Sequence, residues 1–338
     1  MSPFTQHSLV ETLQAYKRTS LLKAGLELRV FDALADGPAE AATVAKAAGT
    51  DERRTAVLLG ALAAVGLLDC HDTEFALPEG GELLVSTGPG FRGGAVKLLV
   101  SDAEWDAMRD LATLVRTGGP ALATDPGFGY WQDFAAQATF VTKSTVEVFL
   151  DALTAWAVDR PAPHLLDLGC GHALFGLLFT QRFAHARMSG LDGADVLPAA
   201  RAQAARLDVT DRAEFLAGDA FTAPLDGPYD VVVAANLLPL FSPERCAVLL
   251  RRIAGVLRPG GRLVLAGFVT GERPPAEETE AHLLSLLMLA WTTGGQAHSV
   301  ATYRALLAEA GFGEPEVRPV GGLPVRVLVA GTVNEGNG

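Results

Sequence analysis

Residues 164–176 read HLLDLGCGHALFG, a pattern that predicts a strand, a tight turn and a helix in immediate succession. Residues 165–168 form a short apolar run, interrupted only by Asp167, as expected for a buried strand. Gly169 and Gly171 allow backbone conformations that other residues avoid, and they let the backbone approach a ligand closely. The first N–H groups of the helix that follows have no partners within the helix. The stretch therefore predicts a cradle for a small molecule.

Apolar strand candidates alternate with helix candidates from this stretch onward. The strand candidates are residues 164–168, 187–191, 213–217, 229–234, 262–267 and 325–330, with helices between them, for example at 197–207 and 244–257. This alternation is typical of an α/β fold with a doubly wound, mostly parallel sheet. Ligands of such sheets bind beyond the carboxyl ends of the strands. We therefore expect a ligand-binding catalytic domain over residues 161–338.

The first hundred residues have a mostly helical pattern that ends in a hairpin. Helices are expected at 21–34, 43–48 and 51–65, followed by short strands at 66–70 and 74–77. Three helices and a β wing form a winged helix, which serves either DNA binding or packing and dimerisation. After Arg54 the third helix has mostly Ala, Val, Leu and Gly, which offer few donors to bases or phosphates. The pattern favours a winged-helix dimerisation domain over residues 1–100.

Residues 101–160 are expected to form a helical connector, with turns at 118–120 and 125–127. Large apolar side chains are concentrated here, and they suit the wall of a substrate pocket as well as an ordinary interdomain core. The residues expected to line a substrate pocket are Trp105, Met108, Trp131, Phe140 and, further along the chain, Trp291.

Composition narrows the class of protein. The chain has 338 residues, of which 49% are hydrophobic and 20% charged, as expected for two ordered domains. A net charge of −12 argues against a nucleic-acid partner. Three widely spaced cysteines without a Cys-x-x-Cys pair predict neither a disulfide framework nor a metal site. No signal segment or membrane-length apolar run is present, so we expect a cytoplasmic protein with no membrane partner.

Polar and small residues follow the other strand candidates in order. Asp192 comes about 20 residues after the glycine turn, where a carboxylate can accept both hydroxyls of an adenosine ribose. Asp219, within residues 218–221, follows the strand candidate at 213–217, and Asn236 follows the one at 229–234. Asp167 alone could cap a helix, and the other acids alone could be solvated, but the set favours a bound adenosine. Leu174 replaces the third glycine of a dinucleotide motif.

These positions make the chain similar to the class I S-adenosylmethionine-dependent methyltransferases. Within that class it resembles bacterial relatives of the plant caffeate-type small-molecule O-methyltransferases, whose winged helix dimerises. Further stretches that carry the resemblance are LELRVFDAL at 26–34, GFGYWQDF at 127–134, LRPGG at 257–261 and LLAEAGF at 306–312. The resemblance implies a homodimer with a Rossmann-like catalytic domain that binds S-adenosyl-L-methionine and releases S-adenosyl-L-homocysteine.

The resemblance also implies a role for each position in the cofactor site. The glycine turn would surround the methionine part, with Asp167 near its amino group. Asp192 would hold the ribose, Asp219 and Phe221 the adenine, and Asn236 would lie beneath the transferring methyl group. The expected cofactor-binding residues are Asp167, Gly169, Gly171, Asp192, Gly218, Asp219, Ala220, Phe221 and Asn236.

The chain departs from the family at the catalytic base. Many members have a histidine just after the fourth strand, but here residues 236–242 read NLLPLFS, with Pro239 at that position. A later Gly-Gly-x-Glu-Arg-Thr element reads GGQAHS at 294–299, with Ala297 at the acid position. Neither side chain can accept a proton. His298 beside this gap is an alternative catalytic base, and the other interpretation is a loop histidine that contacts substrate or solvent.

We therefore predict a methyltransferase that acts on a small aromatic or polyketide-type secondary metabolite. Oxygen is the expected acceptor atom, because it is the usual one in the family that the chain resembles. Positioning alone supplies much of the rate, while a general base adds ~10²–10⁴-fold, so transfer without the histidine is feasible. The alternatives are C- or N-methylation, or a methyltransferase fold repurposed for a cyclisation or elimination with the cofactor bound. A winged-helix regulator ranks last.

Overall fold

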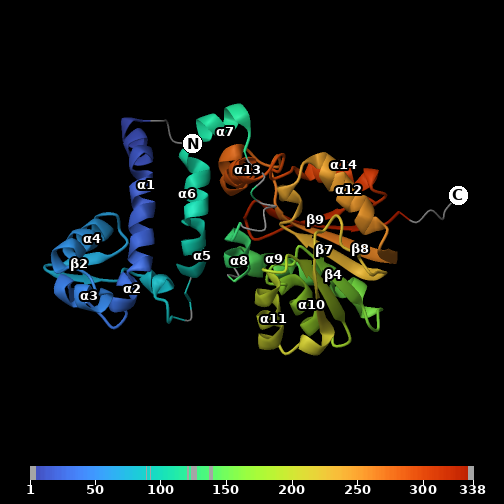
Figure 1. Cartoon of the computed structure of the whole chain (residues 1–338), viewed down its shortest axis with the longest axis horizontal. Helices are drawn as coiled ribbons and strands as arrows, with labels where there is room; N and C mark the ends of the chain where they lie inside the picture. The colour runs from blue at the N-terminus through green and yellow to red at the C-terminus, as the bar shows by residue number, and fades with distance from the viewer. Residues whose placement is uncertain are drawn as a thin grey trace. The chain divides into compact units, whose positions relative to one another are not determined.

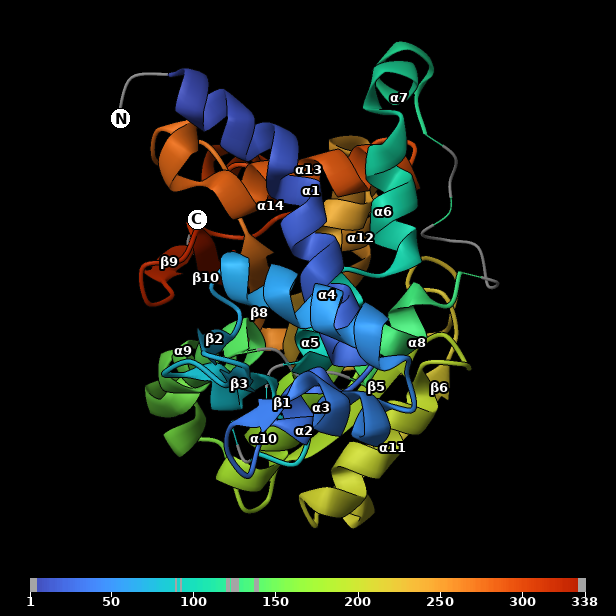
Figure 2. The same cartoon turned by 90° about the vertical axis from the view of Figure 1, so that its left-hand side faces the viewer.

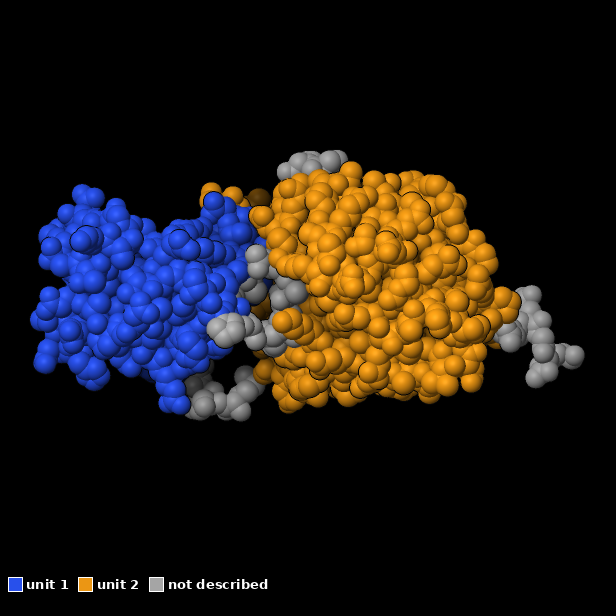
Figure 3. All heavy atoms as spheres, turned by 90° about the horizontal axis from the view of Figure 1, so that it is seen from below, with its two compact units in different colours: residues 1–105 blue, residues 106–338 orange. Residues whose placement is uncertain are grey.

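The protein is described by a computed structural model that covers residues 5–88, 90, 91, 93–119, 122, 128–136 and 140–333. The chain divides into two compact units, Met1–Trp105 and Asp106–Gly338 (Figure 3). Each unit has its own hydrophobic core. This division puts one boundary at residue 105, and a separate connector over residues 101–160 remains a prediction.

The first unit consists of helices with a small three-stranded sheet. Its helices are α1 (Gln6–Glu27), α2 (Val30–Ala33), α3 (Ala41–Ala48), α4 (Glu52–Ala64), the short η1 (Gly81–Leu84) and α5 (Gly93–Leu99), and α6 (Asp102–Arg109) begins in it. Its sheet has the order β1-β3-β2, from β1 (Ala39–Glu40), β2 (Asp69–His71) and β3 (Glu74–Ala76). The side chain of Asp51 caps α4 by accepting the Arg54 N–H at 2.9 Å. The helical region with its β wing is confirmed.

One predicted helix is wrong in its bounds. The expected helix at 21–34 is two helices, because α1 ends at Glu27 and Arg29 has a left-handed φ of 56° before α2 begins. The break turns α2 back onto α1, where a Cβ on Gly25 would lie 2.8 Å from the Phe31 ring. Tertiary packing of Phe31, which is 1% exposed, therefore overrides an apolar periodicity that runs on through the break.

The second unit is built on a seven-stranded sheet of order β6-β5-β4-β7-β8-β10-β9 (Figure 1). The strands are β4 (His164–Leu168), β5 (Arg187–Asp192), β6 (Ala213–Ala217), β7 (Tyr229–Ala235), β8 (Leu257–Phe268), β9 (Glu316–Pro319) and β10 (Val325–Gly331). The five strands from β6 to β8 are parallel, whereas β10 pairs antiparallel with both of its neighbours, β8 and β9. The predicted doubly wound sheet is confirmed, although β9 was not expected.

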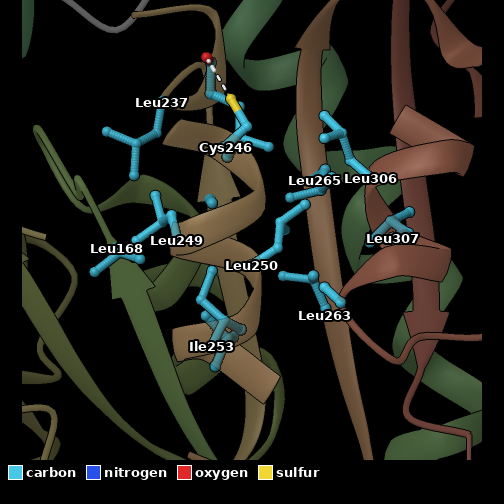
Figure 4. Close-up of a cluster of buried hydrophobic side chains, with 14 of the residues drawn as sticks. Leu168, Leu237, Cys246, Leu249, Leu250, Ile253, Leu263, Leu265, Leu306 and Leu307 are labelled. Carbon is cyan, nitrogen blue, oxygen red and sulfur yellow. Dashed lines mark hydrogen bonds between the residues drawn. The ribbon is translucent and has the colours of Figure 1, made fainter. Parts of the chain in front are cut away.

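Helices cover both faces of this sheet (Figures 1 and 2). One core combines the strands with α9 (Phe140–Val158), α10 (Leu174–Arg182) and α11 (Leu197–Arg206). The other combines them with α12 (Pro243–Ala254) and α14 (Val300–Glu309). In Figure 4, leucines of α12 and α14 meet Leu263 and Leu265 of β8. Burial on both faces explains why the central strands β4, β7 and β10 are mostly apolar, unlike the edge strands β6 and β9.

The remaining elements of this unit follow strand ends or precede the sheet. They are α7 (Leu111–Thr117), α8 (Tyr130–Ala135), η3 (Thr210–Arg212), η4 (Leu238–Leu240), η5 (Pro275–Glu277) and α13 (Thr279–Trp291). A Cβ on Gly119 would meet the carbonyl oxygens of Leu289 and Ala290, so the turn after α7 lies against the end of α13. Within the described part of the chain, no helix has the length and apolar character needed to cross a membrane.

Candidate functional site

The glycine turn after β4 is both tight and open to a ligand. Gly169 and Gly171 have φ values of +67° and +54°, which favour glycine. A Cβ on Gly169 would lie 2.8 Å from Cδ1 of Leu237, so this glycine is needed for packing as well as for conformation. A Cβ on Gly171 would meet nothing within 4 Å. The turn therefore packs on one side against the residue after Asn236 and faces free space at Gly171.

Asp167 is a buried carboxylate beneath this turn. The residue is 1% exposed, and its Oδ2 accepts the Gly176 N–H of α10 at 2.9 Å. Burial, and to a smaller extent the nearby Asp192, raise its pKa to about 7 against the opposing effect of that hydrogen bond. The residue does cap the turn, as its alternative interpretation expected. A carboxyl group held this far from its ordinary pKa would also gain strongly from a cationic partner.

Asp192 connects the end of β5 to the glycine turn through hydrogen bonds of its side chain. Its Oδ2 accepts the Gly171 N–H and its Oδ1 accepts the Gly193 N–H, both at 2.7 Å. Burial raises its pKa, and the two N–H bonds oppose that shift. Each carboxylate oxygen can accept more than one hydrogen bond, so both remain able to accept from a diol.

The end of β6 brings an acid and an aromatic ring to the same edge. The Gly218 N–H donates to the Asp192 carbonyl at 2.9 Å, and Oδ1 of Asp219 accepts the Phe221 N–H at 2.8 Å. The Phe221 ring lies edge-on to Phe241, with centroids 4.9 Å apart. The Arg245 guanidinium lies 4.3 Å from the Phe221 ring centroid, a contact that the sequence alone did not indicate. Ala220 is buried in the core below.

Asn236 lies where β7 and β8 end together. It has a left-handed φ of 55°, and its N–H donates to the Ala266 carbonyl at 2.7 Å. A Cβ on Gly267 would lie 3.0 Å from Oδ1 of Asn236, so a glycine is needed beneath this side chain. Asn236 is exposed, which leaves its amide accessible at the strand edge.

The structure thus brings the nine predicted cofactor-site residues to the carboxyl ends of β4, β5, β6 and β7. Their chemistry fits S-adenosylmethionine part by part. The carboxylate of Asp167 suits an ammonium, the carboxylate of Asp192 suits a ribose diol, and Phe221 beside Asp219 suits an adenine. Among the described residues, no group of three or more His, Cys, Asp or Glu side chains is arranged to hold a metal ion.

The two positions that lack the family's base and acid lie together. Pro239 is buried in η4, and Gly295 lies so close to it that a Cβ on Gly295 would collide with the Pro239 carbonyl oxygen. Ala297, two residues later, is 4% exposed and donates its N–H to the Ser285 hydroxyl at 3.1 Å. The register in which Pro239 and Ala297 replace the catalytic pair therefore agrees with their neighbouring places in the fold.

His298 lies in the core, 1% exposed. Its Nε2 lies 3.0 Å from the Phe241 carbonyl and 3.7 Å from Sγ of Cys246, and its ring is edge-on to Tyr303. Its Nδ1 is buried without a hydrogen-bond partner. Burial lowers its pKa, against the backbone hydrogen bonds, so the imidazole is neutral. This setting favours a packing role, and catalysis by His298 stays a prediction that only a variant can test.

Five aromatic rings gather around the end of α13. Tyr130 lies 4.6 Å from Trp291 between ring centroids, and Trp131 lies 6.1 Å from it at 85°. Phe128 and Phe134 complete the group, which we call the aromatic cluster. Trp131 and Trp291 were both expected at the substrate pocket. Membership of Phe128 and Phe134 was not expected; Phe128 precedes α8 and Phe134 lies on it.

The other three predicted pocket residues are less closely defined. Trp105 and Met108 are half-buried on α6, one in each compact unit, and each stays a pocket prediction. The side chain of Phe140 falls outside the described residues.

The chain is similar to known O-methyltransferases over most of its length. An O-methyltransferase domain matches residues 132–313, and an O-methyltransferase dimerisation domain matches residues 10–86. Acetylserotonin O-methyltransferase of Mus musculus is 32% identical over 337 residues, covering 92% of this chain and 84% of the relative. The solved structure of the mitomycin 7-O-methyltransferase MmcR has a TM-score of 0.79 at 26% identity, covering 97% of this chain and 98% of that one.

A further relative has a different named reaction. The aclacinomycin 10-hydroxylase RdmB of Streptomyces purpurascens is 28% identical over 284 residues, covering 81% of this chain and 75% of the relative. The chain belongs to the O-methyltransferase family, with the family's dimerisation domain before the catalytic one. It is an S-adenosylmethionine-dependent methyltransferase.

Proposed function

We propose that the chain methylates a hydroxyl group of a small, flat aromatic secondary metabolite. The aromatic cluster carries this proposal: Tyr130 and Trp291 are buried in it, while Phe128, Trp131 and Phe134 are half-buried and offer ring surface to a planar acceptor. The similar protein MmcR is named a mitomycin 7-O-methyltransferase, which supports an oxygen acceptor. Trp131 and Trp291 are proposed to contact the acceptor.

Within the cofactor site we propose the roles that the donor chemistry supports. Asp167 holds the ammonium of the methionine part, and the turn at Gly169 and Gly171 lets the chain approach it. Asp192 accepts the ribose hydroxyls. Asp219 accepts the adenine amino group, while Phe221 lies against the adenine ring. When bound, the sulfonium supplies an electrophilic methyl group, and the protein's contribution is to position the acceptor oxygen.

We also propose a homodimer formed through α1. Large apolar side chains lie exposed along this helix: Leu9, Val10, Leu13 and Tyr16. Leu9, Leu13 and Tyr16 recur at helical spacing, so they share one face that is uncovered within its own unit. The match to a dimerisation domain over residues 10–86 supports a second copy of this chain as its cover. Sedimentation of L13E would show a shift toward monomer, and an unchanged mass would contradict the proposal.

A cytoplasmic location is proposed as well. Cys70, Cys170 and Cys246 are all free thiols, although the first is exposed, and free thiols suit a reducing compartment. Fractionation of the expressing cells, with the protein in the membrane-free supernatant, tests this; recovery outside the cytoplasm contradicts it.

The direct test of the function is turnover. The purified protein is incubated with S-adenosylmethionine and hydroxyarenes, and both S-adenosylhomocysteine and the methylated product are quantified. Equal amounts of the two support the proposal. Binding of the cofactor without product from any hydroxyarene contradicts it.

A second candidate function is a non-methyl reaction in which the cofactor is not consumed. Two observations favour keeping it: a 28%-identical relative is named a hydroxylase, and Pro239 and Ala297 replace the base and acid. Product that forms while the cofactor stays intact would support this candidate over methyl transfer.

A further inference from the structure

We propose that the acceptor is a hydroxyl conjugated with a ring carbonyl, acidic enough to be ionised at neutral pH before it is bound. The protein would then supply position and an aromatic surface, with no base of its own. This inference rests on the proposed function and names the substrate class of the same site.

The aromatic cluster is fixed between the cofactor turn and η4. On one side, Nε2 of Gln132 in α8 donates to Oδ2 of Asp195 at 2.8 Å, three residues after Asp192. On the other side, Trp291 ends α13 and leads directly into the loop whose Gly295 lies against the Pro239 carbonyl. A planar ring packed against this cluster would therefore lie near η4, which contains Pro239 at the position of the family's base.

The groups at that edge cannot remove a proton. Pro239, Leu240 and Ala297 have no basic atom. His298 is buried: its Nε2 is engaged by the Phe241 carbonyl, its basic Nδ1 is enclosed in the core, and its ring packs on Tyr303 rather than on the aromatic cluster. Tyr303 is itself a neutral phenol, because burial raises its pKa.

The titratable groups on α13 are also unsuited. The Glu278 carboxylate accepts three backbone N–H bonds from residues 271–273, at 2.7 to 3.0 Å. Burial alone would raise the pKa of Glu278, but these bonds outweigh it and hold the pKa below its ordinary value, which makes a weak base. His282 precedes Trp291 by nine residues, so it lies about 13 Å away along the helix and about half a turn around it.

The acids on the elements beside the aromatic cluster are engaged or turned to solvent. Asp192 accepts two N–H bonds from the turn, and Asp195 accepts the Gln132 amide. Asp133 on α8 is exposed. Asp167 lies beneath the turn and caps α10. Among the described residues, none of these four acids is left as a base for a ring packed against the half-buried rings of the aromatic cluster.

The missing base sets a requirement on the acceptor. An ordinary phenol has a pKa of about 10, like tyrosine, so only about 0.1% is ionised at pH 7. A hydroxyl with a pKa near or below 7 is at least about half ionised, a gain of roughly 10³ in reactive form before any catalysis. That gain matches the ~10²–10⁴-fold that a general base supplies.

The transfer step then balances without a protein acid or base. The acceptor's proton leaves to solvent before binding. A lone pair of the resulting oxyanion forms the new O–CH₃ bond, while the S–CH₃ bond of the cofactor breaks and its electron pair stays on sulfur. The products are a neutral ether and a neutral thioether. A carbonyl-substituted ring is also electron-poor, which suits stacking on electron-rich indoles.

The test uses matched acceptors on the same ring frames. The first pair is 2-hydroxy-1,4-naphthoquinone and 2-naphthol, and the second is 1,2-dihydroxyanthraquinone and 2-anthrol. The native protein is assayed from pH 6.5 to 8.5 with saturating S-adenosylmethionine, so that Asp167 stays paired, and kcat/KM is obtained for each acceptor from methylated product by mass spectrometry.

We expect turnover of a carbonyl-conjugated member with a rate that hardly changes over this range. The plain phenol of the same frame should be at least tenfold slower at pH 6.5 and should gain about tenfold per pH unit. Equal rates for both members of a pair, with flat profiles, would reveal a base and overturn the inference while keeping the proposed function. Cofactor binding with no acceptor methylated would reject the proposed function, and the inference with it.

Discussion

Affinity for the cofactor should depend on the protonation of Asp167. The carboxyl group has a pKa of about 7 in the protein alone, raised from 3.8 mainly by burial. An ammonium partner favours the ionised form, so binding must displace a proton whenever the pH is below about 7. Affinity should therefore fall as the pH is lowered.

The size of this effect follows from a single titration. For a pKa of about 7, the apparent Kd is proportional to 1 + 10^(7 − pH). Binding should therefore be about tenfold weaker at pH 6 than at pH 8, and about thirtyfold weaker at pH 5.5 than at pH 8. The change should level off above pH 7.5. Proton release on binding should be close to one at pH 6 and close to zero at pH 8.

D167N should separate binding from stability. The variant keeps an oxygen for the Gly176 N–H but loses the charge, so affinity should be low and nearly independent of pH. Since the pKa rises from 3.8 in the unfolded chain to about 7, ionisation destabilises the fold as the pH rises through this window. At pH 8 the variant should thus be more stable than the native chain, by on the order of 4 kcal/mol at most.

Calorimetric titration with S-adenosylhomocysteine, in two buffers of different ionisation enthalpy, measures both the Kd and the proton count. D192N is the matched control: it should weaken binding through the ribose while keeping most of the pH slope. Urea unfolding without ligand gives the stability. A Kd that does not change between pH 6 and pH 8, or a pH dependence of the Kd that persists in D167N, would show that Asp167 does not control the affinity.

Three further predictions follow from the same geometry. G169A should lower the free energy of unfolding in urea by at least ~1–2 kcal/mol, because Gly169 has a left-handed backbone and a Cβ there would contact Leu237. G171A should lower it only by the cost of the left-handed backbone, but this variant should still lose affinity for the cofactor. P239H should raise the turnover of a plain phenol at pH 7 by more than tenfold over P239N, and equal rates would show that no proton acceptor is missing there. R245Q should weaken S-adenosylhomocysteine binding about two- to fivefold in calorimetry, with rescue by R245K, because it removes the cation beside the Phe221 ring; no change would contradict this contact's role.

The parts of the fold that sequence patterns predicted are those with strong local signals. Four of the five parallel strands, all but the edge strand β6, are largely buried, so they appear as mostly apolar runs, and their polar ends mark the ligand edge. The edge strand β9 reads Glu316-Val-Arg-Pro319, which has no apolar signal. The break at Arg29 was hidden because the apolar spacing continues through it, and only the packing of Phe31 on Gly25 reveals it.

The cofactor residues could be predicted because each follows a strand in a known order. The contacts that bring the rings of the aromatic cluster together could not be predicted, since Phe128 and Trp291 are 163 residues apart and meet only through the tertiary fold. The stacking of Arg245 on Phe221 likewise joins α12 to the end of β6. Burial of His298 depends on Phe241, Cys246 and Tyr303 around it, so a histidine in a glycine-rich segment gave no sign of being in the core.

The central claim is that the turn after β4 holds S-adenosylmethionine through the residues at four strand ends. A crystal structure with S-adenosylhomocysteine tests it most directly. We expect the amino group of the ligand within about 3 Å of an Asp167 oxygen, the ribose hydroxyls on Asp192 and the adenine against Phe221. A ligand bound elsewhere, or bound here with its amino group away from Asp167, would contradict it.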